Sequence, residues 1–193
     1  MEAVFSLFAE YYDLPILIWI REHLTCPILD TVMSSITSLG DKGLFWILIA
    51  LVLLAIPKYR KAGVSMIIAM LIGLLICNVT LKPLFARQRP YDYLLEHYGY
   101  FPEILIDLPK DFSFPSGHTA VSIEAAMALL LFNKKLGIPA MILAGIISFS
   151  RLYLFVHYPT DVLASVILGI CIGCLAHWLS GKLCQCKLFK NKL

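Results

Sequence analysis

The chain contains four apolar stretches of nearly membrane-spanning length. They are Ala62 to Leu81, Ser116 to Phe132, Ile138 to Val156 and Val162 to Ser180. A helix needs about 20 mostly apolar residues to cross the hydrocarbon core of a bilayer. The 193 residues are 60% hydrophobic and only 15% charged, which is outside the range of soluble domains. We therefore expect an all-α, polytopic membrane helical bundle that forms one domain over residues 1–193.

A fifth spanning helix is predicted before these four. Leu44 to Ile56 is apolar but too short to span, so the helix must extend backward through Ser34 to Gly43. Because this extension includes Asp41 and Lys42, we expect the helix to be tilted or broken near Gly40. Residues 1–41 offer no clean apolar run, which favours an interfacial amphipathic segment over a sixth span. No cleavable signal peptide is expected at the start.

The basic residues indicate an orientation. They gather in two connections and the tail, at Lys58, Arg60 and Lys61, at Lys134 and Lys135, and at Lys182, Lys187, Lys190 and Lys192. Five spans place these positions on one side, which the positive-inside rule makes cytoplasmic. We therefore expect a multi-pass protein of the cell membrane with a cytoplasmic C-terminus. The loop over residues 82–115 would then be extracytoplasmic.

That loop is rich in proline and aromatic residues, a composition typical of the membrane–water interface. It would act as an interfacial anchor, as a lid over a site, or as both. The six cysteines lie mostly in or beside predicted spans and do not suggest disulfides. A zinc site at Cys171, Cys174, Cys184 and Cys186 is disfavoured because no histidine spacing completes a known type, so no metal is expected.

Three short polar clusters interrupt the apolar chain. They are K-x6-R-P at Lys82 to Pro90, P-S-G-H at Pro115 to His118, and S-R-x5-H-x3-D at Ser150 to Asp161. A charged side chain at bilayer depth costs roughly 3 kcal/mol, so we expect these to be retained for chemistry. Counting spans places all three clusters at the same membrane face, whichever face is cytoplasmic.

The second cluster has the features of a helix N-terminus that binds an anion. Pro115 disfavours helix at Phe114, Ser116 is a favoured cap, and Gly117 allows close backbone approach. Free N–H groups and the helix dipole would then favour a negatively charged ligand. The alternative is an ordinary helix start.

The cations suit a phosphoryl group, whose charged oxygens are stabilised by Lys, Arg and backbone N–H groups. Lys82, Arg89 and Arg151 are the candidates. For the first two, the alternative is a positively charged helix end, which the nearby Arg87 supports. For Arg151 it is snorkelling to the interface, although this cation still needs a counter-charge.

The third cluster pairs a histidine with a carboxylate. Asp161 would hold one nitrogen of His157 and leave the other free as a nucleophile that forms a phosphoenzyme. His118 would protonate the leaving oxygen and later activate water. The alternative for each histidine is a structural role at the interface.

Together the three clusters resemble the signature of the type 2 phosphatidic acid phosphatase superfamily, which also includes vanadium haloperoxidases. The resemblance implies a metal-independent lipid phosphatase without a cofactor, which hydrolyses a terminal phosphate through a phosphohistidine. It assigns catalysis to His157, His118 and Asp161. It assigns phosphate binding to Lys82, Arg89, Ser116, Gly117 and Arg151. It also implies a site facing away from the cytoplasm, and the expected partners are a membrane lipid phosphate and the bilayer, with no nucleic acid.

Several substrates fit this resemblance. Undecaprenyl diphosphate is the best single candidate, and phosphatidylglycerophosphate, phosphatidic acid or lipid A are the alternatives. A transporter or non-catalytic lipid-phosphate binder would need the cations but would not explain two histidines with an Asp. A halide-oxidising enzyme is disfavoured because such relatives are soluble.

Two further polar residues are candidates for a supporting role. Glu124 lies two turns inside its helix, so we expect it to be protonated or paired with a polar group across the bundle. Asn78 lies four residues before Lys82 on the same helix face, where it could orient the lysine.

Overall fold

The computed structural model describes residues 2–185, which form helices and loops without any strand in that range. A segment across one end contains α1 (Glu2–Phe8), the π-helix η1 (Ala9–Asp13) and α2 (Leu14–Leu24). The bundle begins with α3 (Pro27–Thr37), η2 (Ser38–Gly43) and α4 (Leu44–Ala55). The chain returns through η3 (Pro57–Tyr59), α5 (Arg60–Gly73), the π-helix η4 (Leu74–Leu81) and α6 (Lys82–Phe85). After α7 (Pro90–Tyr98) come α8 (Gly117–Phe132), α9 (Lys134–Tyr153) and α10 (Pro159–Gln185).

The predicted all-α membrane bundle is confirmed. Four stretches in the described range are long and apolar enough to cross a membrane: Pro27–Ala55, Pro57–Tyr98, Lys134–Tyr153 and Pro159–Leu183. The shorter α8 is also apolar and gives the fifth expected crossing. Large apolar side chains remain exposed on the outer faces of the bundle, as lipid contact requires. Examples are Leu48, Leu51, Leu75, Ile142, Leu163 and Ile167.

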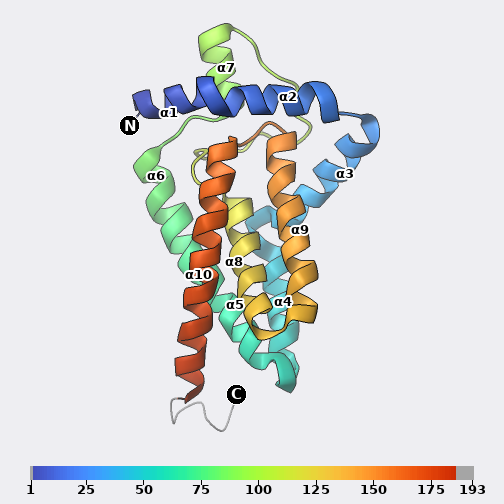
Figure 1. Ribbon diagram of the computed structural model, residues 1–193, viewed down its shortest axis with the longest axis vertical. Coiled ribbons are helices and arrows are strands. Elements are labelled where there is room, and N and C mark those ends of the chain that lie inside the picture. The colour runs from blue at the N-terminus through green and yellow to red at the C-terminus, as the bar shows by residue number, and fades with distance from the viewer. Residues whose placement is uncertain (1, 186–193) are drawn as a thin grey trace.

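Helix α8 forms the centre of the bundle, with α5, α9 and α10 packed around it (Figure 1). Its apolar core is built largely from alanines, including Ala125, Ala126 and Ala128, which are fully buried. Small residues let neighbouring helices approach closely in a membrane protein. Gly169 and Gly173 of α10 do the same from the other side, because a Cβ at either would crowd α8.

The predicted break near Gly40 is confirmed. Asp41 has extended backbone angles, and Lys42 and Gly43 both have positive φ angles of 51° and 69°. Helices α3 and α4 therefore meet at a kink, where a short 3-10 segment brings polar residues to the end of the bundle. The first candidate crossing begins at Pro27, earlier than the expected extension from Ser34.

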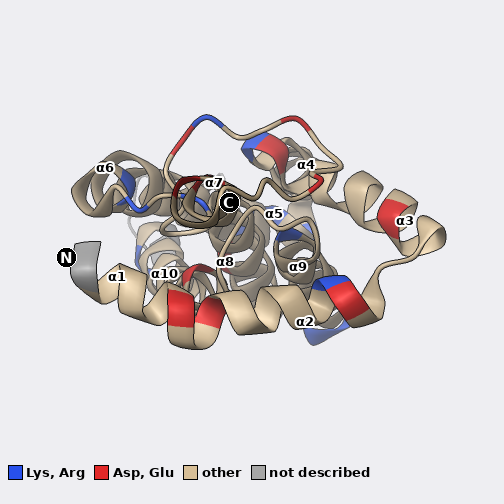
Figure 2. Ribbon diagram, turned by 90° about the horizontal axis from the view of Figure 1, so that it is seen from above, with Lys and Arg blue, Asp and Glu red and all other residues tan. Residues whose placement is uncertain are grey.

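The N-terminal segment lies across one end of the bundle, along the side where α9 and α10 lie (Figures 1 and 2). Leu14 and Leu17 of α2 are buried against Phe155 and Tyr158 of the turn that precedes α10. This transverse part ends at Leu24, whereas the sequence predicted an interfacial segment through residue 41. The difference arises at Pro27, which starts α3 and holds Cys26 in an extended conformation.

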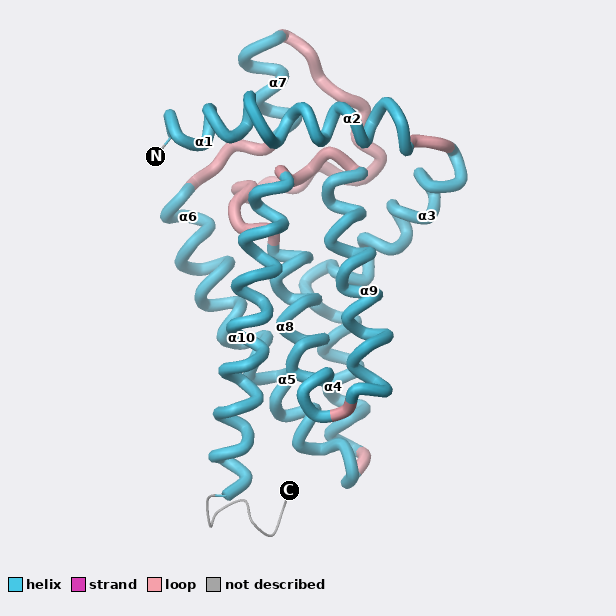
Figure 3. Tube along the Cα trace, viewed as in Figure 1, coloured by secondary structure: helices cyan, strands magenta, loops and turns pink. Residues whose placement is uncertain are grey.

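Most of the non-helical backbone lies at the same end as this segment (Figure 3). The loop expected over residues 82–115 is partly helical there, because α6 continues the preceding helix to Phe85 and α7 follows. Cys26, Cys77, Cys171 and Cys174 are free thiols. Cys186, Lys187, Lys190 and Lys192 lie outside the described residues.

Candidate active site

The three polar clusters meet at the end of the bundle covered by the N-terminal segment. Arg89, from the link before α7, lies 3.3 Å from Nε2 of His157, in the turn before α10. A Cβ placed on Gly117, at the start of α8, would lie 3.9 Å from Nζ of Lys82. The predicted convergence of clusters on one face is therefore seen in the structure.

His157 is buried with its two ring nitrogens in different surroundings. Nδ1 lies 3.5 Å from Oδ2 of Asp161, and Nε2 faces the guanidinium of Arg89. Burial lowers the pKa of His157 well below its ordinary value, and the positive charges of Arg89, Arg151 and Lys82 lower it further. The imidazole is therefore neutral at neutral pH, with Nε2 directed toward the cations.

Asp161 is fully buried and held on both carboxylate oxygens. Oδ2 accepts hydrogen bonds from the Ser113 hydroxyl at 2.5 Å and the Tyr158 N–H at 3.0 Å. Oδ1 accepts one from Arg87 at 2.5 Å. Ser113 also lies 3.5 Å from Nδ1 of His157. Sequence reasoning missed Ser113, because no pattern distinguishes this serine from other loop residues.

The interpretation of Arg87 as part of a positively charged helix end is wrong. Its side chain is buried, with ion pairs to Asp13 and Asp161. The rings of Phe5 and Tyr158 lie 4.7 and 3.8 Å from the guanidinium carbon. A guanidinium can be buried when it is paired with carboxylates. A charge at an ordinary helix end would instead remain in water.

Lys82 and Arg89 share one carboxylate, from Asp111 in the loop before α8. Asp111 forms ion pairs with the ammonium of Lys82 and with Nη2 of Arg89. Burial alone would raise the pKa of the Asp111 carboxyl, but the hydrogen bonds and charges of these cations lower it to about 2. The negatively charged Asp111 is therefore paired with two of the three cations that are predicted to bind phosphate.

Arg151, the third cation, is buried near the end of α9. It donates a hydrogen bond of 2.7 Å to the hydroxyl of Thr37, while its Nε has no hydrogen-bond partner among the described residues. No carboxylate in the described part of the chain forms an ion pair with it. The described residues therefore do not supply the counter-charge that was expected for Arg151. Its guanidinium can still donate hydrogen bonds to an anionic ligand.

The start of α8 brings backbone N–H groups to this site. Ser116 occupies the N-cap position as expected, but its side chain makes no capping hydrogen bond and instead accepts one from Thr119. Its own N–H donates to Ser165 of α10. Gly117 faces Asn78 as well as Lys82, because a Cβ added to this glycine would lie 3.4 Å from Oδ1 of Asn78. Asn78 and Lys82 thus both border this helix start.

His118 has a carboxylate partner that the sequence did not reveal. Its Nε2 lies 2.8 Å from Oδ1 of Asp41, at the break between α3 and α4. Gly40 makes this approach possible, because a Cβ there would lie 2.5 Å from Cδ2 of the His118 ring. The predicted break therefore has a consequence for the site, since it places a carboxylate beside the predicted acid and base.

Glu124 lies deeper in α8 and is 1% exposed. Its Oε2 has no hydrogen-bond partner among the described residues. Gly73 of α5 leaves the space for this carboxyl group, because a Cβ there would lie 1.9 Å from Oε2. The partner expected across the bundle is not found for this oxygen, and a protonated carboxyl stays a prediction.

Comparison with known proteins agrees with this geometry. The PAP2 superfamily model matches residues 58–184, about two thirds of the chain. The chain belongs to the PAP2 superfamily. The resemblance drawn from the three clusters is thereby confirmed, and all three lie within the matched residues.

Two PAP2 relatives of the chain carry the name undecaprenyl-diphosphatase. The chain is 34% identical to the undecaprenyl-diphosphatase of Sulfolobus acidocaldarius over 68% of its own length and 61% of that protein. It is 34% identical to the undecaprenyl-diphosphatase BcrC of Bacillus subtilis, over 77% and 73% respectively. The fold is similar to the crystal structure of the PAP2 type phosphatidylglycerolphosphate phosphatase from Bacillus subtilis, with a TM-score of 0.69 and 26% identity. That similarity covers 94% of this chain and 88% of the other.

Proposed function

We propose that this PAP2 protein is a membrane lipid phosphatase that removes the terminal phosphate of undecaprenyl diphosphate. The observation that carries the proposal is the position of His157 Nε2, which faces Arg89 within a group of three cations. The unpartnered Nε of Arg151 supports the binding of an anion at the same place. The two undecaprenyl-diphosphatases among the relatives favour this substrate.

In the proposed reaction, the lone pair of His157 Nε2 forms a bond to the terminal phosphorus, and the bond between phosphorus and the bridging oxygen breaks. His118 gives its proton to that leaving oxygen, so the lipid departs as a monophosphate. His118 then takes a proton from water, which attacks the phosphohistidine and releases inorganic phosphate. Lys82, Arg89, Arg151 and the N–H groups at the start of α8 stabilise the negative charge on the phosphoryl oxygens.

Phosphatidylglycerophosphate is the second candidate substrate, because the similar crystal structure of that phosphatase covers nearly the whole chain. Both lipids present a terminal phosphate, so the same chemistry applies. We also propose that the site faces away from the cytoplasm and that the C-terminus is cytoplasmic, on the distribution of lysine and arginine. A reporter fused after Leu193 should therefore read out as cytoplasmic.

The decisive experiment measures phosphate release by the purified full chain from undecaprenyl diphosphate, phosphatidylglycerophosphate, phosphatidic acid and lipid A in detergent. We expect His157→Ala to abolish turnover and His118→Ala to lower kcat by about a thousandfold. His97→Ala is a matched control, because His97 stacks on Tyr93 of α7 and forms no hydrogen bond or ion pair with His157 or His118 among the described residues. Full activity in His157→Ala would overturn the mechanism, and binding of lipid without phosphate release by the wild type would identify a non-catalytic binder.

A further inference from the structure

The Arg87 guanidinium connects the N-terminal segment to Asp161. Its Nη2 donates a hydrogen bond of 2.6 Å to Oδ2 of Asp13, the last residue of η1. Its Nη1 donates to Asp161 Oδ1 at 2.5 Å and to the Thr160 hydroxyl at 2.7 Å. Asp13 and Asp161 are completely buried, so this is a charge network inside the protein.

Asp13 also holds the first turn of α10 directly. Its Oδ1 accepts a hydrogen bond of 2.9 Å from the N–H of Thr160, and its Oδ2 accepts one of 2.6 Å from the Thr160 hydroxyl. The first N–H groups of a helix have no partner within the helix, and a carboxylate is favoured there. Because Asp161 is the next residue, Asp13 fixes the turn that carries it.

A third connection runs through the backbone of Arg87. Its carbonyl oxygen accepts a hydrogen bond of 2.8 Å from the N–H of Ser113, whose hydroxyl donates to Asp161 Oδ2. Arg87 therefore acts on both oxygens of the carboxylate, through its side chain on one and through Ser113 on the other. Together with the Tyr158 N–H, Arg87 thus helps to orient Asp161 relative to His157.

The charge of the Asp161 carboxylate is only partly neutralised by Arg87. One guanidinium is shared by two buried carboxylates, so Asp161 does not have the whole positive charge to itself. It can then stabilise the positive charge that develops on His157 when its nitrogen bonds to phosphorus. Loss of Asp13 would leave Arg87 paired with Asp161 alone and weaken that stabilisation.

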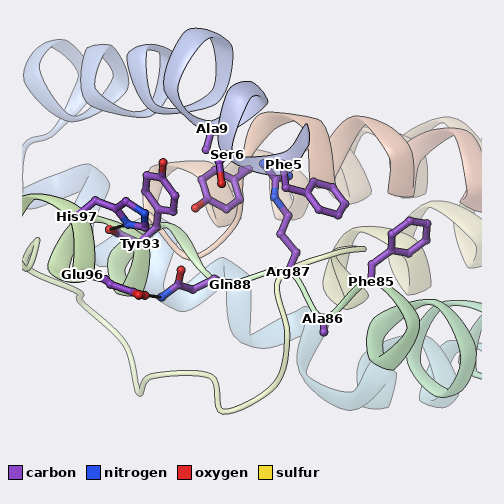
Figure 4. A pocket seen from close by; sticks show the side chains of 11 residues that line it. Phe5, Ser6, Ala9, Phe85, Ala86, Arg87, Gln88, Tyr93, Glu96 and His97 are labelled. Atoms are coloured by element: carbon purple, nitrogen blue, oxygen red, sulfur yellow. Dashed lines mark hydrogen bonds between the residues drawn. The ribbon is translucent and has the colours of Figure 1, made fainter. Parts of the chain in front are cut away.

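The surroundings of Arg87 also show what holds it in place. Its side chain extends from the link between α6 and α7 toward α1, beside Phe5 (Figure 4). It borders a cavity of about 380 Å³ that is also lined by Ser6, Gln88 and Tyr93. The cavity leaves space beside the guanidinium, so the ion pairs with Asp13 and Asp161 are what fix its position.

We propose that Asp13 and Arg87 are positioning residues for the reaction, and that the N-terminal segment is thereby a working part of the active site. Asp13 lies outside residues 58–184, which match the family model. The inference rests on the proposed phosphatase function. It predicts that a residue on the transverse segment controls kcat through Asp161, without touching the substrate.

The test separates positioning from simple anchoring of the segment. Glu10→Gln is the matched control for Asp13→Asn, because Glu10 lies on the same segment and accepts a hydrogen bond of 3.0 Å from the Tyr93 hydroxyl. Phosphate release from undecaprenyl diphosphate gives kcat and KM for each full-length variant, and thermal unfolding gives Tm. We expect Asp13→Asn to lower kcat about tenfold to a hundredfold with KM changed less than about twofold. Glu10→Gln should keep kcat within about twofold at a similar change in Tm.

A second arm tests whether Asp13 acts through Asp161. In an Asp161→Asn background, Asp13→Asn should change kcat less than about twofold, because residues that act as one unit are not additive. Arg87→Lys provides a second variant should Asp13→Asn fold poorly, since an ammonium group cannot hold both carboxylates in the same geometry. Arg87→Lys should lower kcat as Asp13→Asn does, with KM changed less than about twofold.

Three results would overturn the positioning role while leaving the proposed function intact. They are wild-type kcat in Asp13→Asn, an equal loss in Glu10→Gln, or an undiminished loss in the Asp161→Asn background. A wild-type protein that releases no phosphate would instead overturn the proposed function and this inference with it.

Discussion

Two histidine–carboxylate pairs lie at the same end of the bundle but in opposite environments. His157 and Asp161 have side chains that are 1% and 0% exposed, and Asp161 is held by Ser113, Tyr158 and Arg87. His118 and Asp41 have side chains that are 21% and 61% exposed, and Asp41 lies on the broken helix between α3 and α4. The first pair is fixed by the protein, whereas the second borders solvent.

This difference matches two separate chemical demands. A nucleophile must keep one nitrogen aligned with phosphorus, and a fully hydrogen-bonded carboxylate provides that alignment. An acid that later becomes a base must reach a leaving oxygen and then a water molecule, so access to solvent is useful. The same pair of residue types would therefore perform different tasks according to burial.

The sharpest test compares the two carboxylates. We expect Asp161→Asn to lower kcat roughly a thousandfold, because it removes the charge and the orientation of a buried catalytic imidazole. Asp41→Asn should lower kcat only about fivefold, because an exposed ion pair contributes up to about 1 kcal/mol. Both values come from steady-state phosphate release at low ionic strength, where the exposed pair is least screened.

Salt provides the control for this comparison. Raising the salt concentration should reduce the difference between Asp41→Asn and the wild type, while the effect of Asp161→Asn stays constant. Equal losses in the two variants, at any salt concentration, would show that burial does not distinguish the pairs.

The sequence predicted both residues of the buried pair. In the exposed pair it predicted His118 but not Asp41. His157 and Asp161 lie four positions apart, so a local pattern can reveal them. The partner of His118 lies 77 positions away, and no local pattern connects Asp41 with it. The break near Gly40 was predictable, because charges interrupt an otherwise apolar helix, but its contact with His118 depends on how α3, α4 and α8 pack.

The same reasoning explains why Arg87 and Asp13 were missed. Arg87 lies within the first polar cluster, where its charge alone suggested a helix end in water. Only the fold shows that η1 places Asp13 at 2.6 Å from it, across 74 positions of sequence. By contrast, the five crossings were predictable because apolar length is a property of the chain itself.

A smaller effect is expected at Asp111, a third carboxylate that is 55% exposed. It lies on Lys82 and Arg89, so a substrate phosphoryl group must compete with it for these cations. Asp111→Asn should therefore lower KM about threefold to tenfold with kcat nearly unchanged, measured with undecaprenyl diphosphate. Asp107→Asn in the same loop serves as the control, because Asp107 forms no ion pair with any described cation. A higher KM in Asp111→Asn would mean that Asp111 orients the cations and does not compete for them.

The smallest expected effect concerns pH, and it distinguishes a buried from a solvated imidazole. An imidazole with an ordinary pKa of about 6.5 is roughly three-quarters protonated at pH 6. Burial and the nearby cations lower the pKa of His157 well below that value, so it should remain largely neutral at pH 6 and keep its lone pair. Lowering the pH from 7.5 to 6.5 should then leave its availability as a nucleophile nearly unchanged. NMR of protein labelled with ¹⁵N-histidine, with the His157 signal assigned by its loss in His157→Gln, measures this directly. If the His157 signal shows that the imidazole is mostly protonated at pH 6, the cations and burial do not keep the nucleophile neutral.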